Sequence, residues 1–178
     1  MIPRIPIPLE QLSVQPYTLW DKQWFVLAAG DFTAGQFNAM TVSWGFLGVM
    51  WDKMIAQVVV RPHRYTFEFI EKYPTYTLNT FAPAFRPALN LLGSRSGRDG
   101  DKIADSGLTP QRAAKVAAPC FEQAELVLEC RKLYWQDIDP THFLDPQLDR
   151  NYPRKDYHRA FYGEIVAAAG VPAYIRRL

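Results

Sequence analysis

Short runs of strand-forming residues, separated by turn residues, constrain the fold of this chain most. In the runs at 41–47 and 75–81, apolar and polar side chains alternate, as in a strand with one buried face. The helices predicted between runs are short, whereas a parallel sheet would need longer helices between its strands. The spacing is that of hairpins, so the sequence predicts a mainly β fold, an antiparallel barrel with short additional helices. The strands are predicted at 17–29 (with a turn at Gly30-Asp31), 41–47, 58–60, 75–81, 125–135 and 161–168, and the helices at 66–72 and 84–92.

The chain is expected to form a single domain over residues 1–178. Hydrophobic residues make up 48% of it and aromatic residues 14%, which supplies a sizeable core and argues against disorder as the dominant state. Prolines near the start favour an extended arm over residues 1–15. The segment 136–156 is rich in Asp and Pro and is predicted to be a long loop.

Charge and cysteine content exclude several classes of protein. A net charge of +2 is too balanced for a nucleic-acid binder. No apolar stretch is long enough to span a bilayer, and the start lacks the apolar run of a signal peptide. Cys120 and Cys130 are too few for a disulfide framework, so we expect free thiols and a cytoplasmic location. The histidines are widely separated and the acidic residues at 137–149 do not form a calcium loop, so no metal site is predicted.

The strand at 41–47 presents a candidate binding face. Thr41, Ser43 and Gly45 share one side of it, and a planar ring could lie against these small residues and their backbone amides. The other side is apolar, and Trp44 on that side is expected in the core. An ordinary half-exposed strand would show the same pattern, and for the strand taken alone this explanation is preferred.

Two arginines precede the helix predicted at 66–72. Arg61 and Arg64 have the charge and fork geometry that suit a phosphate, and Thr66 at the predicted N-cap adds a hydroxyl beside free backbone N–H groups. Glu68 in the same turn could satisfy the helix end instead. Arginines at a helix start are also typical of solvated surface, so the local pattern favours neither interpretation.

The glycine-containing loop at 93–102 differs from a nucleoside triphosphate loop. No Gly-Lys-Ser or Gly-Lys-Thr follows at the required spacing. Ser94, Ser96 and Lys102 could still approach an anion, and a plain surface loop is an equal alternative.

Several motifs occur in the order and spacing of one known family. They are Asn38-x-Met40-Thr41-x-Ser43-Trp44, Arg61-Pro62-x-Arg64-Tyr65-Thr66, Thr77-x-Asn79, Ser96-Gly97-Arg98-Asp99-x-Asp101-Lys102, and His158 ahead of Phe161-Tyr162-Gly163-Glu164-Ile165. Over roughly residues 20–170 the chain resembles the flavin reductase-like FMN-binding split barrels, and most closely their flavoredoxin-type branch.

The resemblance implies a Greek-key split barrel that forms a homodimer and binds FMN, rather than FAD, near the subunit interface. The isoalloxazine ring would be lined, largely through backbone groups, by Asn38, Ala39, Met40, Thr41, Val42 and Ser43. The phosphate would be held by Arg61, Arg64 and Thr66, and the ribityl and phosphate surroundings completed by Asn79, Ser96 and Lys102. His158, near the flavin or the nicotinamide approach, is the candidate catalytic residue.

The function expected from the resemblance is that of an FMN-dependent oxidoreductase that takes hydride from NADH or NADPH. Its electron acceptor would be a small molecule or a protein. The alternative is a flavin-carrying electron-transfer protein without NAD(P)H turnover of its own, because the sequence shows no recognisable nicotinamide motif. A flavin-free interaction barrel is a third hypothesis, and it predicts a colourless protein.

Overall fold

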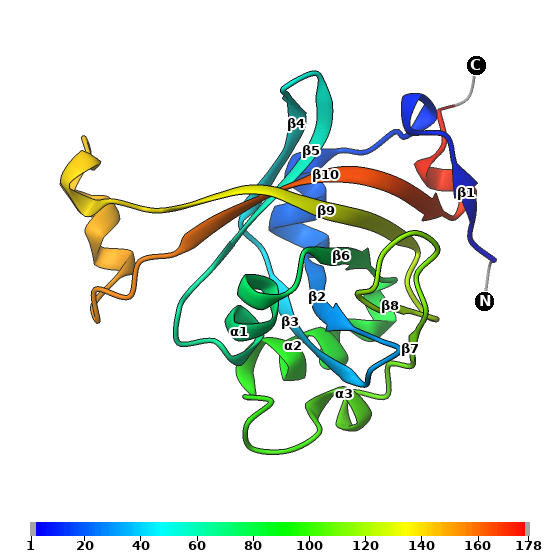
Figure 1. The fold of residues 1–178 in the computed structure, drawn as a ribbon, viewed down its shortest axis with the longest axis horizontal. Helices are drawn as coiled ribbons and strands as arrows, with labels where there is room; N and C mark the ends of the chain where they lie inside the picture. The colour runs from blue at the N-terminus through cyan, green and yellow to red at the C-terminus, as the bar shows by residue number, and fades with distance from the viewer. Residues whose placement is uncertain (1–2, 177–178) are drawn as a thin grey trace.

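An antiparallel sheet of eight strands forms the body of the protein in the computed structural model, which describes residues 3–176 (Figure 1). The strands follow the order β3-β2-β6-β9-β10-β5-β4, and β1 pairs with β10. Among the described residues the end strands β3 and β4 do not pair with each other, so the sheet stays open, and the predicted split barrel is confirmed. The strands are β1 (Ile5–Ile7), β2 (Phe25–Asp31), β3 (Gln36–Val42), β4 (Gly45–Met50), β5 (Lys53–Val60), β6 (Thr75–Thr80), β9 (Leu126–Asp137) and β10 (Arg159–Gly170), with a separate small pair, β7 (Pro110–Gln111) and β8 (Cys120–Phe121).

Short α-helices lie against one end of this sheet (Figure 1). They are α1 (Tyr65–Lys72), α2 (Arg86–Ser94) and α3 (Lys102–Asp105). The helix α2 packs on β3, and α1 packs on both β2 and β3. The helices predicted at 66–72 and 84–92 are therefore confirmed within two residues at each end.

Two clusters of buried side chains lie on opposite faces of β2. Phe25 and Leu27 belong to the first cluster, which also contains Leu78 of β6. Val26 and Ala28 belong to the second cluster, beneath α2. Both faces of β2 are covered, which explains its uninterrupted apolar sequence. Complete burial of a side chain such as Leu78 contributes roughly 1.5–3 kcal/mol to folding.

The strand predicted at 17–29 is wrong in its first half. Residues Thr18–Gln23 form a π-helix, and β2 begins only at Phe25. Leu19 and Trp20 are buried in the first cluster, so packing overrides the local strand preference. The predicted turn at Gly30-Asp31 is also wrong, because β2 continues to Asp31. Gly30 is required for a different reason: a Cβ atom there would lie 2.2 Å from the carbonyl oxygen of Gln36.

The strand predicted at 41–47 is two strands. β3 ends at Val42 and β4 begins at Gly45, and the two pair with β2 and β5 respectively. The chain crosses between the two ends of the sheet here, so the alternation of faces does not continue through Ser43 and Trp44. The prediction that Trp44 is a core residue is therefore wrong, and its side chain is 47% exposed.

The far ends of β9 and β10 project from the body of the sheet and carry residues 138–158, which we call the excursion (Figure 1). It contains two 3-10 helices, Pro140–His142 and Pro146–Asn151, where a long loop was predicted. Its neck is closed by Arg159, whose guanidinium donates to both carboxylate oxygens of Asp137 at 2.7 and 2.9 Å. The excursion is thus clamped at its base.

The arm predicted over residues 1–15 is extended at β1, where Ile5 lies opposite Gly170 of β10. Residues 1–2 of that arm lie outside the described residues. Cys120 and Cys130 are buried free thiols, as expected. Within residues 3–176, the helices are too short or too polar for any of them to cross a membrane.

Candidate functional site

A cavity of about 250 Å³ lies where the chain passes from β3 to β4, and we call it the crossover cavity. Residues from three places meet around it: the end of β3 with the crossing segment, the end of β5 with the turn that follows, and the start of β10. The lining residues are Met40, Thr41, Val42, Ser43, Trp44, Val59, Arg61 and His158. Most of the residues predicted to surround a planar ring are therefore brought together here.

The strand β3 offers its backbone to this cavity more than its side chains. Within the described residues β3 pairs only with β2, so the N–H and C=O groups along its outer edge have no neighbouring strand. The hydroxyl of Thr41 is already used, because Oγ1 donates to the carbonyl of Leu89 in α2 at 2.5 Å. Ala39, Met40 and Val42 are buried. Ser43, which was predicted on the same face as Thr41, has a half-exposed side chain.

A second cavity, of about 140 Å³, lies between the turn at 61–64, the start of α1 and the end of α2, and we call it the cationic cavity. No side chain caps the N-terminus of α1, which begins after Arg64. The lining residues are His63, Arg64, Tyr65, Ser94, Arg95, Ser96 and Lys102. Ser94, Ser96 and Lys102 of the loop at 93–102 therefore lie around the same cavity as Arg64.

Two cations of this cavity lack a counter-ion. Lys102 is 3% exposed, and its Nζ donates only to the carbonyls of Leu92 and Arg95, at 3.0 and 3.1 Å. Arg64 donates to the carbonyl of Gly93 at 2.7 Å. Among residues 3–176 neither cation has a carboxylate within 4.0 Å. Burying charge without a partner is costly, so the arrangement favours an added anion.

The pKa values of both cations are lowered in this environment. Burial, and then the neighbouring charge of Arg64, lower the pKa of Lys102 to about 8. Burial and the charge of Arg61 also lower the pKa of Arg64. A bound anion would reverse these effects, because it favours the charged form of each group.

Arg61 differs from Arg64 in its contacts. Its guanidinium donates to the carboxylate of Asp156 at 3.1 and 3.2 Å and to the carbonyl of Asn151 at 2.7 Å. It also lies 5.0 Å from the centre of the Tyr152 ring. The charge of Arg61 is thus balanced within the excursion, and the residue lines the crossover cavity instead of the cationic cavity where it was expected to hold a phosphate.

His158 is held at the wall of the crossover cavity by two aromatic neighbours. Its ring lies 5.3 Å from that of Trp44, and its Nδ1 is 2.9 Å from the hydroxyl of the buried Tyr152. When that hydroxyl donates to Nδ1, which is its acceptor among the described residues, Nε2 carries the ring proton. Burial, and then Arg61, lower the pKa of His158 to about 4. His158 is therefore a neutral hydrogen-bond donor near neutral pH.

Asn38 and Thr66 form one buried pair. Nδ2 of Asn38 donates to the hydroxyl of Thr66 at 2.8 Å, and the two side chains are 4% and 1% exposed. The prediction that Thr66 caps the helix is wrong, because α1 begins at Tyr65 and Arg64 stands at its N-cap. Glu68, the alternative partner for the helix end, instead pairs with Arg98. The pair ties β3 to the first turn of α1.

The remaining predicted residues divide between the site and the core. Ser96 lines the cationic cavity, and its hydroxyl accepts a bond from the N–H of Arg98 at 3.2 Å. Asn79 is fully buried, where Nδ2 donates to the carbonyl of Val26 at 3.1 Å. It lines neither cavity, so the structure does not bring it to the residues it was predicted to accompany.

Sequence reasoning missed Tyr152 and Asp156. Both lie in the excursion, where no periodicity or motif singles them out. Their partners are remote in the chain, since Asp156 meets Arg61 across 95 positions. A possible signal was the short distance in sequence between these two residues and His158.

Comparisons with known proteins identify the family and the fold of this chain. A family model described as a flavin reductase like domain matches residues 22–173. No curated protein sequence matches the chain. The fold is similar to that of an FMN-binding domain of a flavin reductases-like enzyme from Shewanella baltica OS155, with a TM-score of 0.69, 19% identity, and coverage of 96% of this chain and 78% of that one.

Two other solved structures show the same fold. Flavoredoxin of Desulfovibrio vulgaris (Miyazaki F) superposes with a TM-score of 0.65 and 20% identity, over 90% of this chain and 73% of that one. An FMN-binding protein from Thermus thermophilus with bound 1-cyclohex-2-enone superposes with a TM-score of 0.63 and 21% identity, over 85% and 72% of the two chains.

Proposed function

Because this chain belongs to the flavin reductase-like domain family, we propose that it is an FMN-binding oxidoreductase. The single observation that carries the proposal is the pair of cations without a counter-ion, Arg64 and Lys102, beside a cavity edged by unpaired strand backbone. A phosphate supplies the missing negative charge. A planar ring with both donors and acceptors on its rim suits a strand edge.

Each part of the site has a proposed role in binding FMN. Arg64 and Lys102 bind the phosphate, with Ser96 beside them. The outer edge of β3 orients the ring in the crossover cavity, and Trp44 and His158 form the wall that limits access of water. The flavin, when bound, supplies the redox chemistry, so the chain needs no acid–base triad of its own.

Hydride from NADH or NADPH is the proposed source of electrons. The neutral Nε2–H of His158 can donate to a carbonyl oxygen of the molecule that lies against the ring, such as the carboxamide of a nicotinamide. The Thermus thermophilus protein is described with bound 1-cyclohex-2-enone and with bound p-hydroxybenzaldehyde. A small carbonyl compound is therefore also a suitable electron acceptor for this chain.

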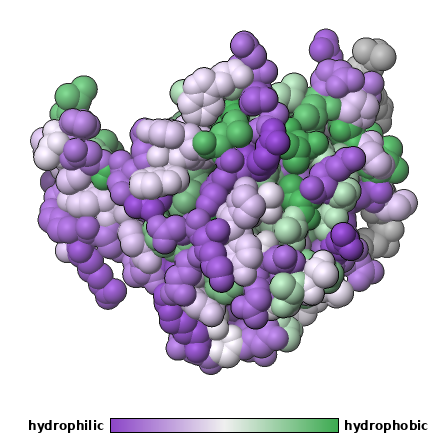
Figure 2. All heavy atoms as spheres, viewed as in Figure 1, coloured by the Kyte–Doolittle hydropathy of each residue, from purple (hydrophilic) through white to green (hydrophobic). Residues whose placement is uncertain are grey.

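A homodimer is the proposed assembly. Large apolar side chains are exposed next to the crossover cavity, on the β4–β5 hairpin and the projecting part of β9; this aromatic face consists of Phe46, Val49, Trp51, Tyr134 and Trp135. Figure 2 shows hydrophobic atoms at the surface in the upper part of the view, where Figure 1 places β4 and β5. These side chains lie on both sides of the hairpin and of β9, and exposed apolar side chains gathered on one projecting part of a protein are typical of a protein–protein interface.

Two measurements test the function. The first is the absorption spectrum of the purified protein before and after addition of FMN, and a protein that neither retains nor binds FMN would overturn the proposal. The second is anaerobic mixing of the FMN-loaded protein with NADH and with NADPH, followed at the flavin absorption band. Rapid bleaching supports the oxidoreductase.

The second candidate is a flavin-carrying electron-transfer protein, favoured by the structural similarity to flavoredoxin and by the exposure of Trp44 at the cavity mouth. In that case the flavin is bleached only by a protein donor and not by either nicotinamide. The same stopped-flow experiment therefore separates the two functions.

A further inference from the structure

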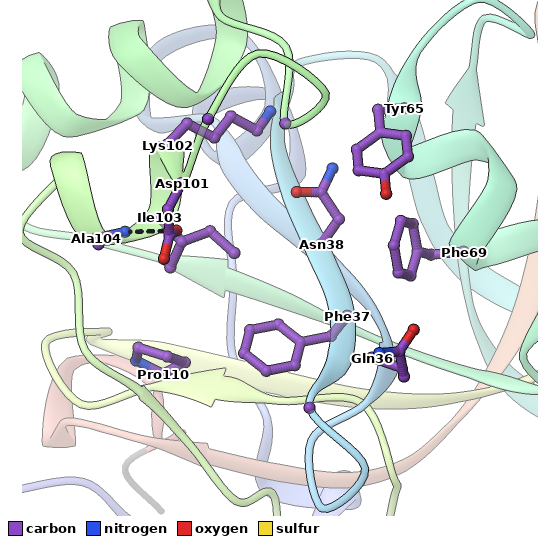
Figure 3. Close-up of a pocket in the computed structure, with 13 residues that line it drawn as sticks. Gln36, Phe37, Asn38, Tyr65, Phe69, Asp101, Lys102, Ile103, Ala104 and Pro110 are labelled. Carbon is purple, nitrogen blue, oxygen red and sulfur yellow. Dashed lines mark hydrogen bonds between the residues drawn. The ribbon is translucent and has the colours of Figure 1, made fainter.

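Two further cavities are larger than the crossover cavity and the cationic cavity. One, of about 470 Å³, lies between the start of β3, α1 and the segment 97–104. It shares Tyr65 and Lys102 with the cationic cavity, so it extends the proposed flavin site (Figure 3). The other, of about 460 Å³, shares no lining residue with these three cavities, and we call it the arm cavity. Its size is within the usual range for small-molecule sites, yet the proposed function does not use it.

The arm cavity lies between the extended arm at β1 and the β7–β8 pair, which are at the right of the view in Figure 1. Its floor is the sheet, where Val127 of β9 lies opposite Ala169 of β10 and Ala169 lies opposite Pro6 of β1. Glu129 is two residues from Val127 along β9, so its side chain is on the same face of the sheet. The floor therefore combines short apolar side chains with one carboxylate.

Glu129 is a buried carboxylate held by backbone groups. The residue is 4% exposed, and its two carboxylate oxygens accept the N–H groups of Ala114 and Lys115 at 2.8 and 2.6 Å. Each carboxylate oxygen has two lone pairs, so the group can accept further hydrogen bonds. The carboxylate thus ties the segment after β7 to the sheet and keeps acceptor capacity at the cavity floor.

Arg4 is the half-buried cation of the same cavity. Its Nη1 donates to the carbonyls of Glu122 and Ala124 at 2.7 and 2.5 Å, which leaves the other guanidinium N–H groups for a further acceptor. Within residues 3–176, neither Arg4 nor Glu129 has a group of opposite charge within 4.0 Å. Two opposite charges therefore line one cavity without pairing with each other.

The arm cavity also has apolar walls. Cys120 lines it and is buried. Burial raises the pKa of the Cys120 thiol, so the thiol is uncharged at neutral pH and behaves as a small apolar side chain. Together with Val127 and Ala169, it supplies apolar surface to the cavity. Arg112 and Glu122, the other charged residues of the lining, are exposed and in contact with water.

A ligand that carries both charges satisfies Arg4 and Glu129 together. An ammonium group has three donors for a carboxylate, and a carboxylate matches the planar fork of a guanidinium. An anion alone would leave Glu129 without a counter-ion, and an amine alone would leave Arg4 without one. Because a buried charge without a partner is costly, the arrangement favours a zwitterion over either ion.

We propose that the arm cavity binds a small zwitterion, an amino acid whose ammonium meets the carboxylate of Glu129 and whose carboxylate meets the guanidinium of Arg4. The hydrocarbon part of the ligand lies on Val127 and Ala169. Because the arm cavity and the proposed flavin site have no lining residue in common, FMN and the zwitterion should bind at the same time.

An NMR titration of the protein tests the class of ligand. The probes are two zwitterions that differ in charge separation, L-alanine and γ-aminobutanoate, and their counterparts with one charge: ethylamine, propanoate, propylamine and butanoate. At least one zwitterion should bind about tenfold or more tighter than both of its counterparts, because each counterpart lacks one charged hydrogen-bonding group. The backbone N–H signals of Ala114 and Lys115 should shift during the titration, since both groups donate to Glu129.

Two variants test the position of the site by independent means. Arg4→Met removes the charge that meets the ligand carboxylate, and Ala114→Trp places a large ring at an exposed alanine of the lining. Each should weaken binding of the zwitterion about tenfold or more. Ala117→Trp is the control, because Ala117 is exposed in the same segment but does not line the cavity. Urea denaturation curves show whether each variant is folded.

The proposal is upheld if a zwitterion binds tighter than its counterparts and both variants weaken it while the control does not. If an amine or an acid alone binds as tightly as the zwitterion, one of the two charges is not recognised and the proposal is overturned. Absence of binding by both zwitterions at millimolar concentration also overturns it. Binding that is retained in either folded variant, or that FMN displaces, belongs to another part of the molecule and overturns it as well.

Discussion

The hydroxyl of Tyr152 lies 2.9 Å from Nδ1 of His158, the last residue of the excursion before β10 begins at Arg159. This contact is expected to favour the tautomer that carries its proton on Nε2. The ring of His158 lines the crossover cavity.

Tyr152→Phe should reduce the rate of flavin reduction while leaving FMN affinity within about twofold. The loss of one hydrogen bond of roughly 0.5–1.5 kcal/mol corresponds to a change in rate of about two- to thirteenfold. Nitrogen NMR of the His158 ring should show a mixture of tautomers in the variant and one tautomer in the wild type.

Tyr157→Phe is the matched control, because Tyr157 is in the same excursion but donates to Asp149 at 2.7 Å. Equal rate losses in the two variants would mean that Tyr152 supports only the structure of the excursion. The tautomer measurement distinguishes these cases without any turnover.

Stability should fall as the pH is lowered from 6.5 towards 4, in part because of His158. In the folded protein, burial and Arg61 lower its pKa to about 4, whereas its ordinary value is 6.5. Between these values the unfolded chain binds a proton that the folded chain does not, so acid favours unfolding. Asp156 opposes the shift, and His63 adds to it.

Urea denaturation at pH 7 and pH 5 measures this effect. The loss of stability between the two values should be smaller in His158→Gln than in the wild type. If the loss of stability between pH 7 and pH 5 is the same in His158→Gln as in the wild type, His158 has the same pKa in the folded and the unfolded chain.

Removing either cation of the cationic cavity should weaken FMN binding. A hydrogen bond to a charged group is worth roughly 1.5–3 kcal/mol, so Arg64→Ala and Lys102→Met should each raise Kd about ten- to hundredfold. Riboflavin, which has no phosphate, should bind both variants as it binds the wild type. Lys22→Met is the control, since Lys22 is exposed and paired with Asp21.

FMN affinity should also fall as the pH rises above 8. The pKa of Lys102 is lowered to about 8 in the ligand-free protein, so at pH 9.5 binding a phosphate requires the lysine to regain its proton. Fluorescence titration at pH 7 and 9.5 should show the decrease for FMN in the wild type. The same decrease in Lys102→Met would assign the effect to another group.

Gly163→Ala should destabilise the barrel by roughly 1–3 kcal/mol, as overpacking of a core does. A Cβ atom there would lie 2.5 Å from the hydroxyl of Tyr76, which is fully buried and donates to the carbonyl of Ala56 at 2.5 Å. Gly48→Ala is the control, because a Cβ atom at Gly48 meets nothing within 4 Å. The two free energies of unfolding, obtained from urea curves, should differ by at least about 1 kcal/mol.

The double variant Phe46→Asp/Val49→Asp should convert the proposed dimer to a monomer. These side chains of the aromatic face are 72% and 75% exposed in the single chain, so charges there should spare folding and oppose association. Light scattering after size-exclusion chromatography gives the molar mass. Tyr17→Asp is the control, because Tyr17 is 90% exposed and lies outside this face, and it should leave the molar mass unchanged. A monomeric wild type would contradict the proposed homodimer.

The sequence predicted most strands because their signal is local. Alternation at 75–81 and the apolar run within 17–29 depend only on neighbouring residues, and β6 and β2 are found there. The π-helix at Thr18–Gln23 was missed because its cause is the burial of Trp20 against Gly45, where a Cβ atom would lie 2.4 Å from the indole. That contact joins residues 25 positions apart, which no local pattern encodes.

The candidate site, like the fold, was predicted where the signal is local in the sequence and missed where it depends on remote contacts. The motifs predicted Arg64, Lys102 and the end of β3 as binding residues, and the structure places them around two cavities. They could not separate Arg61 from Arg64, because the difference between them is the carboxylate of Asp156, supplied from the excursion. Trp44 was misplaced for a related reason: the crossing of the chain between sheet ends is a property of the whole barrel.

The clamped neck of the excursion has a consequence for how such proteins diversify. One uninterrupted stretch, attached between Asp137 and Arg159, provides Tyr152 and Asp156, which contact His158 and Arg61 in the cavity wall. The strands of the sheet pair with one another outside this stretch. Replacing the stretch is therefore expected to change the surroundings of Arg61 and His158 while the order of the strands stays the same.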